Sequence, residues 1–128
     1  MGIIQRLHSG DIFIGFDLDN DNLKSSREII EKSVGEFARN NGITIHCLHA
    51  NFRDIKTKLL EIGICSVTAV CYDLGVSSAH FDDRERGFSF RFSGKLDMRF
   101  DRENGGKTAY DIVNHTGEKE LIELLRIS

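Results

Sequence analysis

Apolar residues alternate between strand-like and helix-like spacing along the first half of the chain. Asp11–Phe16 is an apolar run that predicts a strand ending at Asp17. From Asn20 to Ala38, apolar residues recur every three or four positions, which predicts an amphipathic helix closed at Gly42. Ile43–Leu48 is again apolar and rich in β-branched residues, and it predicts a second strand.

The pattern continues with one more helix and one more strand. Phe52–Ile62 has helical spacing and ends before a glycine, whereas Ser66–Tyr72 is apolar, β-branched and typical of a buried strand. Helix-length connections between strands predict an α/β fold with a parallel sheet and right-handed crossovers. After a long polar loop, Lys107–Asn114 and Glu118–Ile127 predict two short helices.

Composition limits the class of protein. The chain has 128 residues, 40% of them hydrophobic and 29% charged, which predicts a single globular domain over residues 1–128. It has neither an apolar run of the ~18 residues that span a bilayer nor a signal-peptide pattern, so we expect a cytoplasmic protein without membrane contact. Cys47, Cys65 and Cys71 lie in apolar runs, which predicts reduced core thiols.

Charge alone does not indicate a nucleic-acid partner. The net charge is −3, and the segment from His80 to Lys107 holds seven basic and six acidic residues. No metal site is expected either. His46 and Cys47 point to opposite faces of their strand, and the acidic pattern over Asp17–Glu28 lacks the glycine of a calcium loop.

Three motifs in the second half of the chain carry a resemblance. Asp73–Ser78 has the sequence DLGVSS, Glu85–Phe90 has ERGFSF, and Leu96–Arg99 has LDMR. In this order they resemble the signature of the ribosomal RNA small subunit methyltransferase H family, over about Ile3 to Leu125. The resemblance implies S-adenosylmethionine as cofactor, the N4 amine of a decoding-region cytidine as methyl acceptor, and small-subunit (16S) ribosomal RNA or the 30S subunit as partner.

The cofactor would lie at the carboxyl ends of the strands, where open α/β sheets bind ligands. Asp17 ends the first predicted strand, and the resemblance implies that it binds the ribose hydroxyls; Asp19 and Asp21 fit a helix cap better. The resemblance also implies that Phe52 flanks the adenine. The alternative for Phe52 is packing against its own helix.

The best catalytic candidate is Asp73, at the end of the third predicted strand. A carboxylate that accepts an N–H of the cytosine amine would orient its lone pair toward the methyl group, a gain of positioning. The alternative is an Asp that caps the next turn. His80 stands where the family has a glutamine that contacts the cofactor, so the resemblance implies that His80 contacts the cofactor. The resemblance implies a cofactor contact for Asp73 as well.

The loop after Asp73 would receive RNA. Its alternating aromatic and basic side chains can stack an extruded base and contact phosphates. The residues predicted for this role are Arg84, Arg86, Phe88, Phe90, Arg91 and Arg99. The alternative is a loop folded back on its own aromatic cluster.

Relative to the family, the chain starts after the glycine-rich turn that holds the cofactor's methionine part. It also stops before the family's helical RNA-contacting insert. The resemblance therefore implies a partial Rossmann-like class I methyltransferase fold, with a sheet that lacks its first strand and its C-terminal part. We expect the chain alone to bind the cofactor weakly or not at all, not to methylate, and to be either marginally stable or self-associated through open sheet edges. A rival interpretation is a non-catalytic RNA-binding or ribosome-assembly module.

Overall fold

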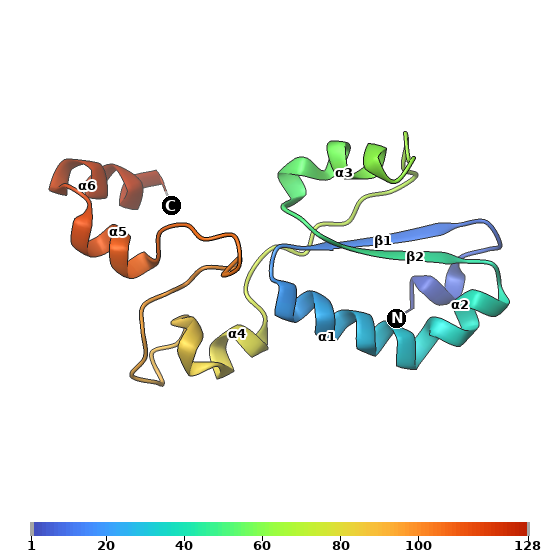
Figure 1. Ribbon diagram of the computed structural model, residues 1–128, viewed down its shortest axis with the longest axis horizontal. Coiled ribbons are helices and arrows are strands. Elements are labelled where there is room, and N and C mark those ends of the chain that lie inside the picture. The colour runs from blue at the N-terminus through green and yellow to red at the C-terminus, as the bar shows by residue number, and fades with distance from the viewer. Residues whose placement is uncertain (1, 128) are drawn as a thin grey trace. The chain divides into compact units, whose positions relative to one another are not determined.

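The computed structural model describes residues 2–127, which divide into two compact units (Figure 1). The first extends to Val70 and the second starts at Cys71. The prediction that residues 1–128 form one domain stays a prediction. No helix within residues 2–127 has the length and apolar character needed to cross a bilayer.

The first unit contains a parallel sheet of two strands. β1 (Ile12–Asp17) pairs with β2 (Thr44–His49), in a register that runs from Ile12 opposite Thr44 to Asp17 opposite His49. Both strands and their parallel direction were predicted from the apolar runs, and the structure confirms them. Because the strands are parallel, their carboxyl ends lie at the same edge.

A long helix connects the two strands. It consists of α1 (Asn20–Ile30), a single π-helical turn (Glu31–Gly35) and α2 (Glu36–Asn40), as predicted. The Asp19 carboxylate caps α1 by accepting hydrogen bonds from the N–H groups of Asp21 and Asn22 at 2.9 and 3.4 Å. The small core packs between this helix, the N-terminal turn and the sheet; its buried members are Ile4, Val34, Ala38 and Ile43.

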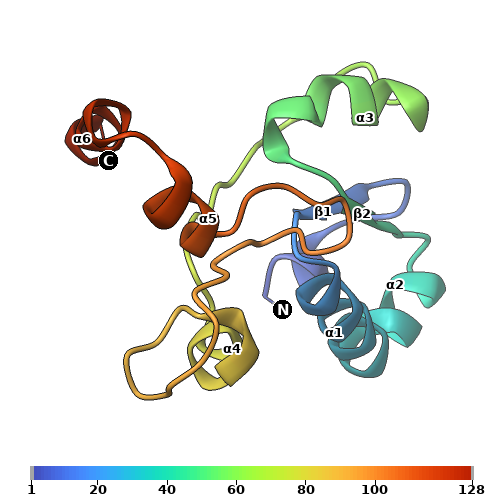
Figure 2. The same cartoon turned by 60° about the vertical axis from the view of Figure 1, so that its left-hand side comes forward.

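A second helical segment follows β2. A 3₁₀ turn (Phe52–Asp54) leads into α3 (Ile55–Glu61), which confirms the predicted helix. The side chain of Asn51 caps it by accepting a hydrogen bond from the Arg53 N–H at 3.0 Å. Figures 1 and 2 place the α1–α2 helix and α3 on opposite sides of the two strands, as a parallel sheet requires.

The prediction of a third strand is wrong. Ser66–Tyr72 is an exposed, irregular segment, and the sheet within the described residues contains β1 and β2 only. Strand propensity becomes strand structure only when a neighbouring strand supplies hydrogen bonds and side-chain contacts. Among residues 2–127, no strand pairs with the other edge of β1, and Ser66–Tyr72 pairs with no strand. Consequently Cys65 and Cys71 are exposed, not core thiols as expected, while Cys47 is half-buried.

The second unit is built from short helices and a long loop. α4 (Ser78–Asp82) is followed by a long loop, residues 84–99, which begins with a 3₁₀ turn (Arg84–Arg86). α5 (Ala109–His115) and α6 (Glu118–Ile127) come after the loop. The structure confirms the two predicted C-terminal helices. α4 was not predicted, although Ser77 and the residue three positions later form its capping box.

Candidate functional site

The carboxyl edge of the sheet brings Asp17 close to the turn that carries Phe52. Asp17 is the last residue of β1, and its carbonyl accepts a hydrogen bond from the Ala50 N–H at 3.1 Å, just after β2. Its Oδ1 accepts the Asp19 N–H at 2.8 Å, which fixes the direction of the carboxylate. Phe52 begins the 3₁₀ turn two residues beyond Ala50 and is 51% exposed. An oriented carboxylate and an accessible aromatic ring therefore share one edge.

Asp73 and His80 belong to the second unit. Asp73 is exposed and follows the irregular segment that was expected to be a strand. Its neighbour Gly75 has a φ of +145°, a conformation that suits glycine. The structure thus leaves Asp73 accessible, and its catalytic role stays a prediction.

His80 is buried and has a structural task. Its Nδ1 accepts the Ser77 N–H at 2.8 Å and lies 2.9 Å from the Ser77 hydroxyl, which completes the cap of α4. Its ring lies 5.2 Å from the ring of Phe88 and 5.1 Å, edge-on, from that of Phe100. These contacts anchor the start of the loop on an aromatic cluster; the contact with cofactor stays a prediction.

Arg86 joins the two ends of the loop. Only 4% of the residue is exposed, and its Nη2 donates to the carbonyls of Arg99 and Phe100 at 3.2 and 3.4 Å. The backbone carbonyl of Arg86 accepts the Met98 N–H at 2.9 Å. Met98 has a φ of +59°, rare for a residue with a side chain, so this crossing point is tightly constrained.

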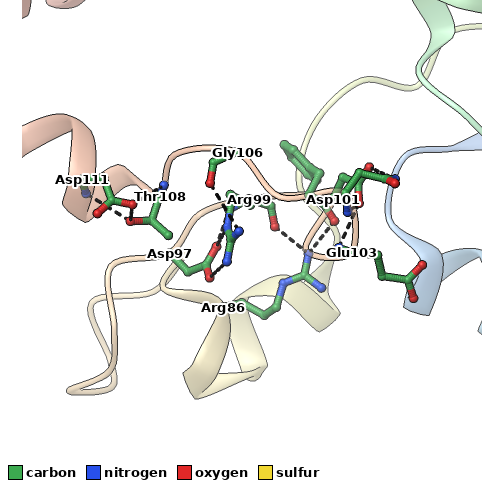
Figure 3. A network of polar contacts seen from close by, with 10 residues as sticks. Arg86, Asp97, Arg99, Asp101, Glu103, Gly106, Thr108 and Asp111 are labelled. Atoms are coloured by element: carbon green, nitrogen blue, oxygen red, sulfur yellow. Dashed lines mark hydrogen bonds and ion pairs between the residues drawn. The ribbon is translucent and has the colours of Figure 1, made fainter.

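Asp97 and Arg99 form a bidentate ion pair at the same crossing (Figure 3). Arg99 Nε donates to Oδ1 and Nη2 to Oδ2, both at 2.8 Å. These hydrogen bonds from Arg99 lower the pKa of Asp97 to about 2. The carbonyl of Asp97 also accepts the Ala109 N–H at 2.8 Å. Together these contacts attach the loop to the start of α5.

The first turn of α5 has its own cap. Thr108 Oγ1 donates to the Asp111 carboxylate at 2.7 Å and accepts the Asp111 N–H at 3.1 Å. The Thr108 hydrogen bonds lower the pKa of Asp111. Arg99 Nη1 also donates to the carbonyl of Gly106 at 3.4 Å, just before this cap (Figure 3).

Two glycines allow the two sides of the loop to approach each other through backbone atoms. A Cβ on Gly87 would lie 2.4 Å from the Lys95 carbonyl oxygen, and one on Gly94 would lie 2.2 Å from that of Arg84. Gly87 also has a φ of +72°. Residues 84–87 and 94–98 therefore form a narrow stem, and residues 88–93 form the tip above it.

The six predicted RNA-binding residues divide into two groups. Arg86, Phe88 and Arg99 are buried or half-buried in contacts within the loop. Arg84, Phe90 and Arg91 are exposed. The loop thus folds back on its own aromatic cluster in part, as the alternative stated, while one aromatic and two cations stay accessible.

Sequence reasoning assigned no role to Asp97, Gly87 or Gly94, although all three shape the loop. The spacing of Asp97 and Arg99, two residues apart and of opposite charge, was the available signal for the ion pair. The two glycines lie near the ends of the aromatic run, but their contacts depend on a crossing that no local pattern shows. Among residues 2–127, no three His, Cys, Asp or Glu side chains gather as metal ligands would.

Comparison with known proteins gives a consistent result along the whole described chain. The model of the MraW methylase family matches residues 2–127. The chain is 43% identical over 122 residues to a ribosomal RNA small subunit methyltransferase H of Bacteroides fragilis, covering 95% of this chain and 36% of that protein. It is 40% identical over 123 residues to the protein of the same name from Mesoplasma florum, and the match covers 96% of this chain and 37% of that protein. The chain spans little more than a third of the length of these relatives.

Proposed function

The chain belongs to the MraW methylase family, and on that premise we propose that it serves transfer of a methyl group from S-adenosylmethionine to the N4 amine of a cytidine in the decoding region of small-subunit ribosomal RNA. The observation that carries the proposal is the family match over residues 2–127, which includes every predicted site residue. The proposed partner is small-subunit RNA or the 30S subunit, and the proposed place of action is the cytoplasm.

The sheet edge suits the nucleoside end of the cofactor. The Asp17 carboxylate is held at the carboxyl end of β1, where an acid accepts hydrogen bonds from both ribose hydroxyls. Phe52 offers a half-exposed ring at the same edge, which can cover one face of the adenine. When bound, S-adenosylmethionine supplies an electrophilic methyl group on its sulfonium.

Asp73 would act on the methyl acceptor. Its carboxylate accepts one N–H of the cytosine amine, so that the nitrogen lone pair points at the methyl carbon. The bound cofactor would supply the methyl group, and the Asp73 carboxylate or water would take the proton that the amine loses. Such positioning can lower a barrier by several kcal/mol.

The loop would hold the RNA. Arg84 and Arg91 are exposed and can approach phosphates, whereas Arg86 and Arg99 keep the loop in shape. This division predicts that replacing Arg91 weakens RNA binding without unfolding the loop.

A non-catalytic RNA-binding module is the second candidate. It is favoured by Ser66–Tyr72, the segment that leads to Asp73, because this segment forms no strand among residues 2–127. Calorimetric titration with S-adenosylmethionine distinguishes the two when this chain is placed within a full-length relative to give a complete version of the protein. Saturable binding that Asp17→Ala weakens by roughly 1.5–3 kcal/mol supports the methyltransferase. RNA binding with no cofactor binding supports the module.

A chimera tests the chemistry directly. The 122 residues of this chain that align with the Bacteroides fragilis relative replace the matching stretch of that protein, and N4-methylcytidine in small-subunit RNA is measured by nucleoside mass spectrometry. We expect methylation by the chimera, and a far greater loss of methylation than of cofactor affinity in its Asp73→Asn variant. Asp82→Asn, an exposed acid in α4, is the matched control. An inactive, folded chimera that binds cofactor would contradict the proposal.

A further inference from the structure

Three phenylalanines alternate along the loop, and each has a different environment. Phe88 packs against the rings of His80 and Phe100, 5.2 and 5.4 Å away. Phe92 lies beneath the guanidinium of Arg84, at 4.9 Å. Phe90, between them, has a relative exposure of 108%. The loop therefore presents one aromatic ring to solvent and uses the other two internally.

The charge around Phe90 has one sign. Residues 87–95 include two basic residues, Arg91 and Lys95, both exposed, and no acidic residue, whereas Arg86 just before them is buried. An exposed apolar ring beside cations matches a partner that offers both a flat π-face and negative charge. A nucleotide in a single strand has this combination, because its base is accessible and its phosphate is anionic.

The tip is also held in place before any partner arrives. The Gly87 and Gly94 contacts close the stem, and the Ser89 hydroxyl accepts the Arg91 N–H at 3.2 Å. A fixed tip loses little conformational freedom on binding, which favours recognition by a single protruding ring.

We propose that Phe90 stacks on one unpaired base of an RNA strand while Arg91 contacts the adjacent phosphate, so that the loop selects single-stranded over base-paired RNA. The inference rests on the proposed function, since it takes RNA as the partner of this loop. In an A-form duplex the faces of the bases are covered by their stacked neighbours. A ring that projects from a loop can then reach only bases outside the helix.

The chain contains no tryptophan, which makes a specific optical test available. Phe90→Trp introduces a single indole at the tip, and Phe81→Trp places one in α4, where Phe81 is 41% exposed. Both variants of the full chain are titrated with an unstructured RNA of about twelve nucleotides and with the same sequence as a duplex. We expect strong quenching of Phe90→Trp by the single strand, little by the duplex, and little change in Phe81→Trp.

Affinity provides the second readout. Phe90→Ala should weaken single-strand binding by roughly 5- to 150-fold, the range for one base stacked on an aromatic ring. Phe81→Ala should leave it unchanged, and circular dichroism checks that both variants fold.

Different failures have different meanings. RNA binding that is indifferent to Phe90 and to base pairing overturns this inference and leaves the proposed function standing. Binding to neither RNA overturns the inference, and the proposed function then depends on binding to the 30S subunit, which the same variants measure separately. A concentration-dependent blue shift of Phe90→Trp without RNA, together with unchanged RNA affinity of Phe90→Ala, would mean that the tip contacts a second copy of the chain, and would also overturn the inference.

Discussion

The two units of the chain are stabilised in different ways. In the first, β1 and β2 pair through repeated backbone hydrogen bonds, and a capped helix covers them. In the second, the loop from residue 84 to residue 99 is held by side chains that bind backbone carbonyls, above all Arg86. The first arrangement tolerates the loss of a single polar side chain because many equivalent bonds remain. The second depends on individual residues.

This difference changes how the basic residues of the loop are interpreted. Four arginines of the loop were predicted to bind RNA, but Arg86 is buried and Arg99 is paired with Asp97. Their charge is used to fix the loop, so removing them would alter RNA binding indirectly. Arg91 is the exposed cation whose removal would act directly, whereas Arg84 is exposed but also packs its guanidinium on the Phe92 ring.

The largest expected effect comes from Gly87→Ala. Its Cβ would lie 2.4 Å from the Lys95 carbonyl oxygen and 2.7 Å from the Asp97 nitrogen, at a φ of +72°. Backbone atoms cannot move aside as a flexible side chain can, so we expect a loss of about 2–4 kcal/mol, measured by urea unfolding of the second unit. Gly117→Ala, where a Cβ meets nothing within 4 Å, is the matched control and should change stability by less than about 1 kcal/mol.

The same substitution in each unit, Arg86→Met and Arg27→Met, tests whether the second unit depends more on single side chains than the first. Each arginine donates to a backbone carbonyl far along the chain, Arg27 to that of Cys47 and Arg86 to those of Arg99 and Phe100. Arg27 is exposed beside a sheet that its backbone already holds. We expect a loss of about 1.5–3 kcal/mol for Arg86→Met and under about 0.5 kcal/mol for Arg27→Met, by chemical denaturation. Equal losses would remove the distinction between the units.

Asp97→Asn should have a smaller and pH-dependent effect. The pKa of Asp97 is lowered to about 2 in the folded chain, from the model-compound value of 3.8. The ionised carboxylate therefore stabilises the fold above about pH 4, and this contribution disappears as the pH falls toward 2. Since water partly screens the pair, we expect a loss of about 1–2 kcal/mol at pH 7.

Thermal unfolding of the native chain and of Asp97→Asn between pH 2 and pH 7 measures this effect. The melting temperatures of the two proteins should converge at the acidic end, where Asp97 is protonated. A difference that stays constant over the whole pH range would show that the side chain acts through its shape and not through its charge.

The same contrast explains what could be predicted from the sequence. β1, β2 and the helices follow from apolar spacing because their residues repeat with the period of the element. Ser66–Tyr72 has the same local signal, yet it forms no strand because pairing depends on a neighbour that its own sequence does not specify. α4 was missed because it is short and its cap uses a histidine, an unusual residue for that position.

The site was predicted less completely than the fold. The position of Asp17 at the end of β1 follows from the strand pattern, and its proximity to the turn of Phe52 follows from parallel pairing. The role of Arg86 could not be inferred, because it depends on contacts with the carbonyls of Arg99 and Phe100 far along the chain. The ion pair of Asp97 had a local signal, the arginine two residues away, which was not used. Alternation of Phe88, Phe90 and Phe92 suggested a common platform, whereas only Phe90 is fully exposed.

Hydrogen exchange at three amides tests most directly whether side chains hold the loop. The backbone carbonyl of Arg86 accepts the Met98 N–H at 2.9 Å, that of Asp97 accepts the Ala109 N–H at 2.8 Å, and that of Leu96 accepts the Tyr110 N–H at 2.8 Å. Met98 lies outside helices and strands, and Ala109 and Tyr110 occupy the first turn of α5, where a helix supplies no internal acceptor. We predict that all three amides are protected in the native chain and lose protection in Arg86→Met, while the amides of β2 keep theirs. Unchanged protection of the three amides in Arg86→Met would contradict the account, because the loop would then keep its shape without that side chain.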